Sequence, residues 1–147
     1  ISTDWQATEL EPYKNLMSKG FADAIMTAHV IHYGLEPSGL PATLSPAVIT
    51  GLLRQQLGFD GVVISDDLQM KAITEGYGFT EAVQRAVLAG VDLMIVGNNL
   101  IRDPDSLARG TAAINDLLDR GVIDPARINA SLQRIDQLKQ KITGEQA

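Results

Sequence analysis

Short apolar runs alternate with helical stripes along this chain. The run at residues 62–64 is apolar throughout, and the segments 21–28 and 92–97 are mainly apolar. A short run that is apolar on both faces fits a strand buried on both sides, as in a parallel sheet covered by helices. The sequence therefore predicts three buried strands, the middle one at residues 62–64.

Between and around these runs the apolar residues recur every three or four positions, which is typical of amphipathic helices. One such stripe follows Ser45-Pro46, a favoured helix start, and stops at Gly58. The other predicted helices cover residues 10–19, the segment from Thr80 to Gly90, the segment from Asp103 to Gly121, and a final stretch after Asp124. Residues 32–46 and 66–79 are predicted to be long loops.

The alternation of strands and helices predicts βαβ units with a parallel sheet. Three strands are too few for a closed barrel, which needs about eight. An open three-stranded sheet would leave two apolar edges bare. The sheet is therefore expected to be completed by another polypeptide, or the chain is a fragment of a larger fold.

Composition narrows the range of partners. The 147 residues suffice for one domain with a core. A net charge of −6 disfavours a nucleic-acid partner, whose phosphates require a basic face. No apolar run approaches the roughly 20 residues that a membrane span needs. The absence of cysteine excludes disulfides and thiolate metal sites.

Polar side chains follow each of the three predicted strands. They are His29, then the Ser65-Asp66-Asp67 group, then the Asn98-Asn99 pair. The carboxyl ends of parallel strands share one edge of the sheet, where α/β folds place their chemistry. Structural interpretations remain open, because Asp pairs and Asn pairs often form turns, and a single His often stabilises a fold.

Asp66 has several possible roles: nucleophile, general base, metal ligand or phosphoacceptor. Asp67 is expected to point elsewhere, because successive residues of an extended chain face opposite sides. The sequence holds no His-x-x-x-His pair and no calcium-loop pattern, so no metal site is predicted. A phosphoacceptor domain would be expected to have an acidic cluster after the first strand, where His29 stands instead.

Several motifs occur in a fixed order along the chain. They are Ile-Met-Thr-Ala-His-Val at 25–30, Leu-Pro-Ala-Thr-Leu-Ser-Pro at 40–46, the stretch 52–73, and Ala-Gly-Val-Asp-Leu-Met at 89–94. Together these motifs resemble glycoside hydrolase family 3, and the Ser-Asp-Asp-Leu-x-Met form of residues 65–70 is similar to its bacterial β-N-acetylhexosaminidase branch.

This resemblance implies an α/β fold, with residues 1–147 forming about the last three βα units of a TIM-type barrel. It implies a retaining glycosidase that removes a terminal N-acetylhexosamine, as in peptidoglycan-derived sugars, without a cofactor. By the same resemblance Asp66 is the nucleophile, and His29 and Met70 line the sugar pocket.

One part of the family pattern is missing. The Lys-His-Phe-Pro-Gly-His-Gly motif and the Asp–His acid loop that follows it do not occur in these 147 residues. The chain alone is therefore expected to be inactive, with its partner either the amino-terminal barrel portion or a second copy joined through the sheet edges. The alternative is a non-catalytic half-barrel completed by self-association.

Overall fold

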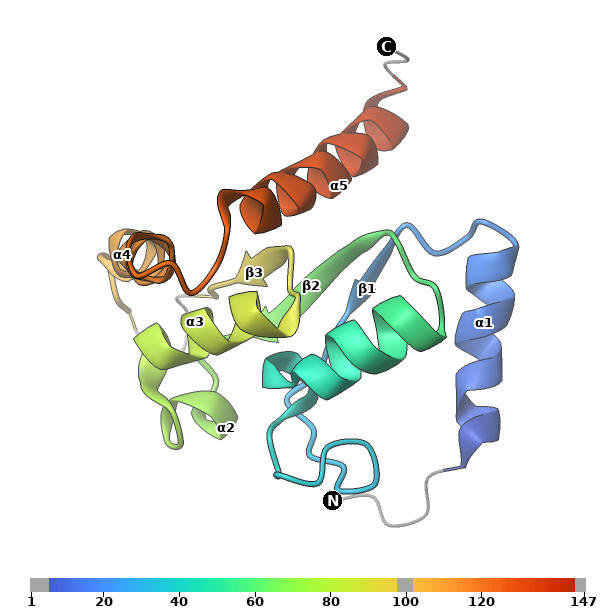
Figure 1. The fold of residues 1–147 in the computed structure, drawn as a ribbon, viewed down its shortest axis with the longest axis horizontal. Helices are drawn as coiled ribbons and strands as arrows, with labels where there is room; N and C mark the ends of the chain where they lie inside the picture. The colour runs from blue at the N-terminus through green and yellow to red at the C-terminus, as the bar shows by residue number, and fades with distance from the viewer. Residues whose placement is uncertain (1–5, 98–101, 145–147) are drawn as a thin grey trace.

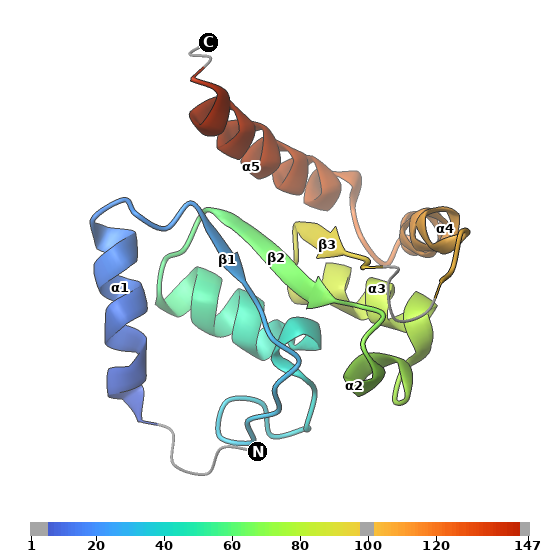
Figure 2. The same cartoon turned by 180° about the vertical axis from the view of Figure 1, so that it is seen from behind.

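A computed structural model describes residues 6–97 and 102–144 of the chain. Three parallel strands, β1 (Ala24–Met26), β2 (Val62–Asp67) and β3 (Leu93–Ile95), form one sheet in the order β1-β2-β3 (Figures 1 and 2). Ala24 pairs with Val62, and Ile64 pairs with Leu93. The predicted parallel βα arrangement is confirmed, and β2 is its central strand.

Helices connect the strands and follow the last one. They are η1 (Ala7–Leu10), α1 (Glu11–Ser18), η2 (Ala42–Leu44), η3 (Ala47–Gln56), α2 (Lys71–Thr74), α3 (Gly78–Ala89), α4 (Ser106–Asp119) and α5 (Pro125–Thr143). The predicted capping at Ser45 is confirmed, because its hydroxyl accepts from the Val48 N–H. The helix that follows, η3, winds with π-type bonds rather than α-helical ones, for example from the Leu57 N–H to the Leu52 carbonyl.

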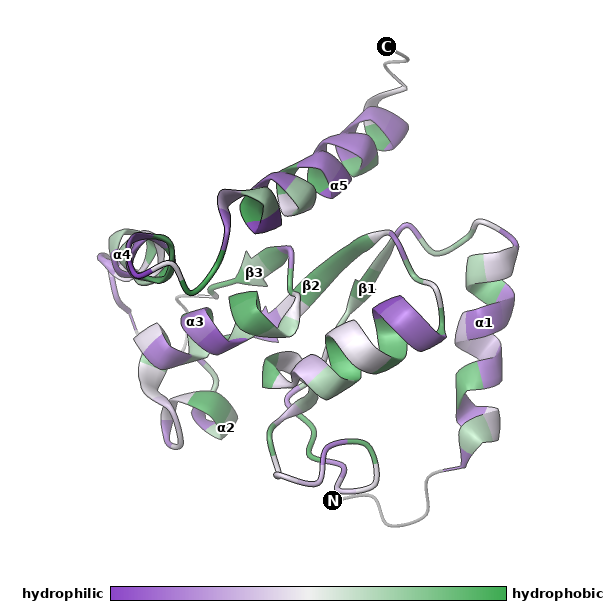
Figure 3. Ribbon diagram, viewed as in Figure 1, coloured by the Kyte–Doolittle hydropathy of each residue, from purple (hydrophilic) through white to green (hydrophobic). Residues whose placement is uncertain are grey.

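Helices η3 and α3 lie together on one face of the sheet (Figure 1). Val63 at the centre of β2 packs into the largest core cluster, together with Ile49 of η3 and Ala86 of α3. Figure 3 shows that the strands are largely hydrophobic along their length. Burial of this apolar surface is the main force that holds the βα units together.

The opposite face of the sheet is turned toward the viewer in Figure 2, and no helix of the described residues crosses it there. Ile25 and Met94 pack toward the helices, so their neighbours Met26 and Leu93 face the other way. Met26 is 60% exposed and Leu93 is 42% exposed, although both are apolar strand residues. This face corresponds to the interior side of a partial β/α barrel.

Two glycines are required by the close approach of neighbouring segments. A Cβ at Gly61 would lie 2.5 Å from the Asp23 carbonyl oxygen, so the turn before β2 admits no side chain. Gly90 ends α3 with a φ of 115° and sits against Thr50 and Ile49 of η3. Both positions fix how a helix leads into a strand.

Several element boundaries differ from the sequence predictions. Strand β2 continues through Asp67, and α2 forms inside the stretch 66–79 that was expected to be a loop. The strand extends because the Ser65 hydroxyl accepts from the Ile95 N–H and keeps β3 attached beyond the apolar run. Helices α3 and α4 begin at Gly78 and Ser106 rather than at Thr80 and Asp103.

The two last helices expose some of the apolar residues that make up their predicted helical stripes. Leu107 is 81% exposed, although α4 packs against Phe79 of α3 through Ala113 and, by a cation–π contact, through Arg109. Leu132 and Ile142 of α5 are exposed as well. Among the helices in the described part of the chain, none is long and apolar enough to cross a membrane.

Candidate active site

Asp66 lies at the carboxyl end of the central strand, next to a β-bulge. Between Ile64 and Asp67 strand β2 advances three residues, while β3 advances two, from Leu93 to Ile95. Such a bulge bends the strand and re-aims its side chains. It places the half-buried Asp66 at the edge of the sheet where TIM-type barrels carry their reactive groups.

The Asp66 carboxylate has few constraints. Its Oδ1 accepts a hydrogen bond of 2.8 Å from the Asp67 N–H. Within residues 6–97 and 102–144, no Lys, Arg or His forms an ion pair with it. A carboxylate that is held through one oxygen and is partly open to solvent can present its other oxygen to a ligand.

Asp67 has a different, structural position. Its Oδ1 accepts from the backbone N–H groups of Gln69 at 2.9 Å and Gly97 at 3.0 Å. Its carbonyl oxygen lies 2.9 Å from His29 Nε2 and accepts from the Met70 N–H at 3.0 Å. Asp67 therefore connects the ends of all three strands. Its carboxylate binds backbone N–H groups and does not take the role expected for Asp66.

His29 stands just beyond β1 and is half-buried. Its Nε2 lies 2.9 Å from the Asp67 carbonyl oxygen, and its Nδ1 lies 3.0 Å from the Thr43 hydroxyl. The structure therefore brings His29 to the same edge as the acidic pair. Both of its ring nitrogens have protein partners.

Met70 follows directly on the same edge and precedes α2, the short helix in the loop after β2. It is half-buried. Asn98 and Asn99, the third predicted polar group, lie outside the described residues. Among the described residues, no cluster of His, Asp or Glu is arranged to hold a metal ion.

A buried carboxylate in the loop between β1 and η3 was not predicted from the sequence. Glu36 is buried, and it accepts hydrogen bonds from the Ser38 hydroxyl at 2.6 Å, the Ser45 hydroxyl at 2.5 Å and the Ser38 N–H. The Ser38 and Ser45 hydroxyls hold the pKa of Glu36 below its ordinary value, against the opposing effect of burial. The loop is therefore tied internally by one ionised side chain.

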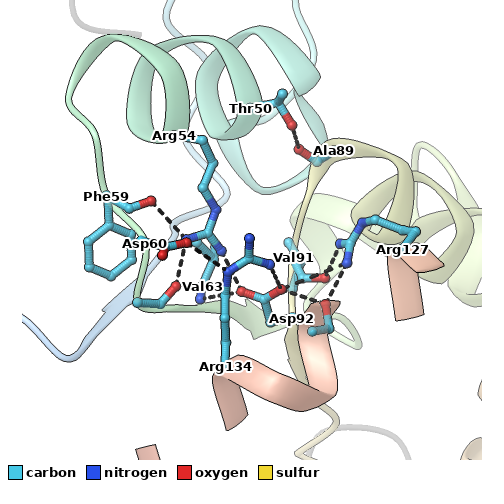
Figure 4. A network of polar contacts seen from close by, with 12 residues as sticks. Thr50, Arg54, Phe59, Asp60, Val63, Ala89, Val91, Asp92, Arg127 and Arg134 are labelled. Atoms are coloured by element: carbon cyan, nitrogen blue, oxygen red, sulfur yellow. Dashed lines mark hydrogen bonds and ion pairs between the residues drawn. The ribbon is translucent and has the colours of Figure 1, made fainter. Parts of the chain in front are cut away.

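A second polar network occupies the opposite end of the sheet (Figure 4). Asp92, at the start of β3, has a side chain with no exposed surface. Its Oδ2 accepts from Arg54 at 2.5 Å and from the Val63 N–H at 2.9 Å. Its Oδ1 accepts from Ser131 at 2.5 Å and from Arg134 at 3.3 Å.

Two of the surrounding arginines also bind backbone carbonyl groups. Arg54 donates to the carbonyl oxygens of Phe59 and Gly61, and Arg127 donates to those of Val87 and Val91. Burial lowers the pKa of Arg54 and of Arg127, and the attraction of Asp92 opposes this shift. This network attaches α5 to the amino-terminal end of the sheet through polar contacts.

Comparison with known proteins places the chain in a family. Residues 2–138 match the family model described as the glycosyl hydrolase family 3 N terminal domain. The chain belongs to glycosyl hydrolase family 3. The predicted resemblance and the expected partial β/α barrel are therefore both confirmed.

Curated relatives of this family 3 chain are named β-hexosaminidases. The protein from Tolumonas auensis is 39% identical over 94 residues, which cover 64% of this chain and 28% of the relative. The protein from Actinobacillus pleuropneumoniae serotype 5b is 41% identical over 90 residues, covering 61% and 26%. The chain spans about a quarter of the length of the curated relatives it matches.

Solved structures give the same result for the fold. A family 3 β-N-acetylglucosaminidase from a Paenibacillus species superposes with a TM-score of 0.84 at 41% identity, over 95% of this chain and 26% of that one. The β-N-acetylglucosaminidase from Thermotoga maritima gives a TM-score of 0.77 at 29% identity, over 88% and 28%.

Proposed function

We propose that this family 3 chain supplies the carboxy-terminal part of the catalytic barrel of a retaining β-N-acetylhexosaminidase, with Asp66 as the nucleophile. The observation that carries the proposal is the position of Asp66. It stands at the carboxyl end of the central parallel strand, beside a bulge, and among the described residues its carboxylate accepts from one backbone N–H.

The reaction follows the two-step course of retaining glycosidases. The free oxygen of Asp66 attacks the anomeric carbon while a general acid protonates the departing glycosidic oxygen. Water then displaces Asp66 from the glycosyl-enzyme, so the sugar leaves with its original configuration. The Asp67 N–H stays on the other oxygen of Asp66 and fixes the direction of attack.

The substrate class is a terminal β-linked N-acetylhexosamine, including peptidoglycan-derived sugars. It is supported by the names of the relatives, which are β-hexosaminidases and β-N-acetylglucosaminidases. His29 and Met70 stand on the same edge as Asp66 and would line the sugar pocket. Because both nitrogens of His29 are engaged, it would meet the sugar through its ring carbons.

The general acid has to come from outside these 147 residues. No Asp–His acid loop is present in the sequence, and general acid catalysis is worth about 10²–10⁴-fold. We therefore expect this chain alone to show little hydrolysis, and the complete barrel to be active.

The uncovered face of the sheet supports completion by further barrel strands. Met26 and Leu93 expose apolar surface there, and a groove beside β1 is lined by apolar residues that include Tyr13, Leu16 and Phe21. The same exposed surface favours the second candidate, a non-catalytic half-barrel that pairs with a copy of itself. Native mass spectrometry separates the two, because self-association gives multiples of 15.8 kDa from one chain only.

The test of the proposed function is the hydrolysis of an aryl β-N-acetylglucosaminide by the full-length protein, which here means this chain together with the amino-terminal portion of the barrel. Its Asp66→Ala variant is assayed in the same way. The variant should lose activity, and added azide should then yield an α-glycosyl azide by attack in place of the missing carboxylate. Asp119→Asn, an exposed change on α4, serves as the matched control. Full activity of Asp66→Ala would overturn the proposal.

A further inference from the structure

We propose that His29 is a positioning residue, which sets the direction of the Asp66 carboxylate through the main chain of Asp67. The inference rests on the proposed function, because it concerns the nucleophile of that reaction. It assigns to His29 a task beyond lining a sugar pocket. The evidence is a chain of hydrogen bonds that runs from a buried loop to Asp66.

The contact with Asp67 fixes the tautomer of His29. A carbonyl oxygen has no proton to give, so Nε2 must be the donor in its 2.9 Å contact with Asp67. In the neutral ring Nδ1 then accepts, and its partner at 3.0 Å is the Thr43 hydroxyl. The ring is held at both nitrogens, and its orientation is therefore determined.

Thr43 is itself held in place. It has no exposed surface, and its hydroxyl accepts a hydrogen bond of 2.9 Å from the Thr27 hydroxyl. With Thr27 donating to it, Thr43 has its own proton available for His29 Nδ1. The two threonines thus select the same tautomer that the Asp67 carbonyl requires.

The loop that carries Thr43 is tied down by Glu36. The carboxylate of Glu36 binds Ser38 and Ser45, which lie on either side of Thr43 in the sequence. The Thr43 N–H also donates to the Ala28 carbonyl, next to His29. These bonds make the loop a firm support for the imidazole.

Asp67 transmits the position of His29 to the nucleophile. Its carbonyl receives the His29 proton, and its own N–H donates to Asp66 Oδ1 at 2.8 Å. Both groups belong to one residue, so a shift of its main chain moves the donor that orients Asp66. The Gly97 N–H, which follows β3, donates to the Asp67 side chain. His29, which follows β1, holds the Asp67 carbonyl from the other side.

The experiment compares three changes at His29 in the full-length protein, with kcat and KM measured separately. Misplacement of a reacting group by about 1 Å can cost roughly 10²-fold, so His29→Ala should lower kcat by about 10- to 100-fold, in addition to any rise in KM from the lost contact between the ring and the sugar. His29→Gln carries an amide N–H near the position of Nε2 and should recover most of the lost kcat. His29→Asn reaches only as far as Nδ1 and should not.

A pair of changes at Thr43 tests the same chain of bonds without altering His29. Thr43→Val keeps the shape but removes the hydroxyl, and should lower kcat by about five- to tenfold, the effect of one lost hydrogen bond. Thr43→Ser keeps the hydroxyl and should match the parent. If His29→Ala does not fold, the Thr43 pair alone decides.

Three outcomes would overturn the inference: equal kcat for the Gln and Asn variants, a change confined to KM, or a Thr43→Val variant with unaltered kcat. An Asp66→Ala variant with full activity would instead overturn the proposed function. The parent and Asp66→Ala are therefore assayed first, so the two failures are distinguished.

Discussion

The two ends of the sheet are both built around a buried or half-buried aspartate, yet they differ in how completely that aspartate is bound. Asp92 at the amino-terminal end has no exposed surface, and two arginines, a serine and a backbone N–H donate to it. Asp66 at the carboxyl end is half-buried and, within residues 6–97 and 102–144, accepts one local hydrogen bond. In β/α barrels the first end serves stability and the second serves catalysis.

This difference has a physical reason. A carboxylate that is taken out of water must have every acceptor position filled, or its burial destabilises the fold. A nucleophile must keep one oxygen unoccupied, and it can do so only where solvent or substrate reaches it. The same residue type therefore holds the fold at one end and remains available at the other.

The largest expected effect is a loss of activity without a loss of stability when Asp66 is changed. Asp66→Asn in the full-length protein should lower kcat/KM on the order of 10⁴-fold, comparable with the loss of other covalent catalytic groups. The free energy of unfolding should change by less than about 0.5 kcal/mol, because the bond altered among the described residues is a local one. Denaturant unfolding measured beside the kinetics checks both; a marked loss of stability would contradict the comparison.

Asp92→Asn should give the reverse result. Removing one partner of a buried charge network costs about 3–5 kcal/mol, because the arginines are left without a counter-ion. The kcat of the protein that remains folded should stay near that of the parent. Urea unfolding and active-site titration measure the two quantities, and a stable but inactive variant would show that both ends contribute to catalysis.

Ser131→Ala is the milder change in the same network. Ser131 receives a hydrogen bond from Arg127 and donates one to Asp92, each at 2.5 Å. Its loss should cost about 1–3 kcal/mol, as for other buried groups left without a partner. Thermal unfolding checks this value, and Ser18→Ala, on the exposed face of α1, is the control. Equal melting temperatures would mean that Ser131 does not hold α5.

The smallest effect concerns the loop that carries Thr43, and it depends on pH. Glu36 has a pKa below its ordinary value of about 4.5 in the folded chain. Its stabilisation is therefore fully present above the ordinary pKa and is lost as the pH falls through the lowered folded value. The stability difference between the parent and Glu36→Gln should be constant near neutral pH and shrink below about pH 4.5. A difference that grows with acid would contradict this assignment.

Local sequence signals were sufficient to predict the architecture. The apolar runs at the three strands and the helix starts at Ser45-Pro46 and Asp124-Pro125 predicted the order of elements and the parallel sheet. The capping contacts at both starts agree, with Asp124 accepting from the Ala126 N–H. The end of β2 was predicted too early, because Ser65 joins the sheet through its hydroxyl and not through an apolar side chain.

The edge that carries Asp66 and His29 was predictable for the same reason, since it follows from strand order. The Asp92 network was not, because its partners Arg54 and Arg134 lie 38 and 42 residues away in the sequence. Nothing local marks Asp92 as different from any charged residue before a strand. Glu36 was missed likewise, because its serine partners resemble ordinary loop residues.

The most direct test of the central claim is to trap the covalent intermediate. The full-length protein would be incubated with a 5-fluoro-N-acetylglucosaminyl fluoride, whose glycosyl-enzyme is hydrolysed slowly, and the labelled peptide would be sequenced by mass spectrometry. We expect one sugar attached to Asp66 and no label in Asp66→Asn. A label on another residue, or rapid turnover of the substrate without any covalent species, would contradict it.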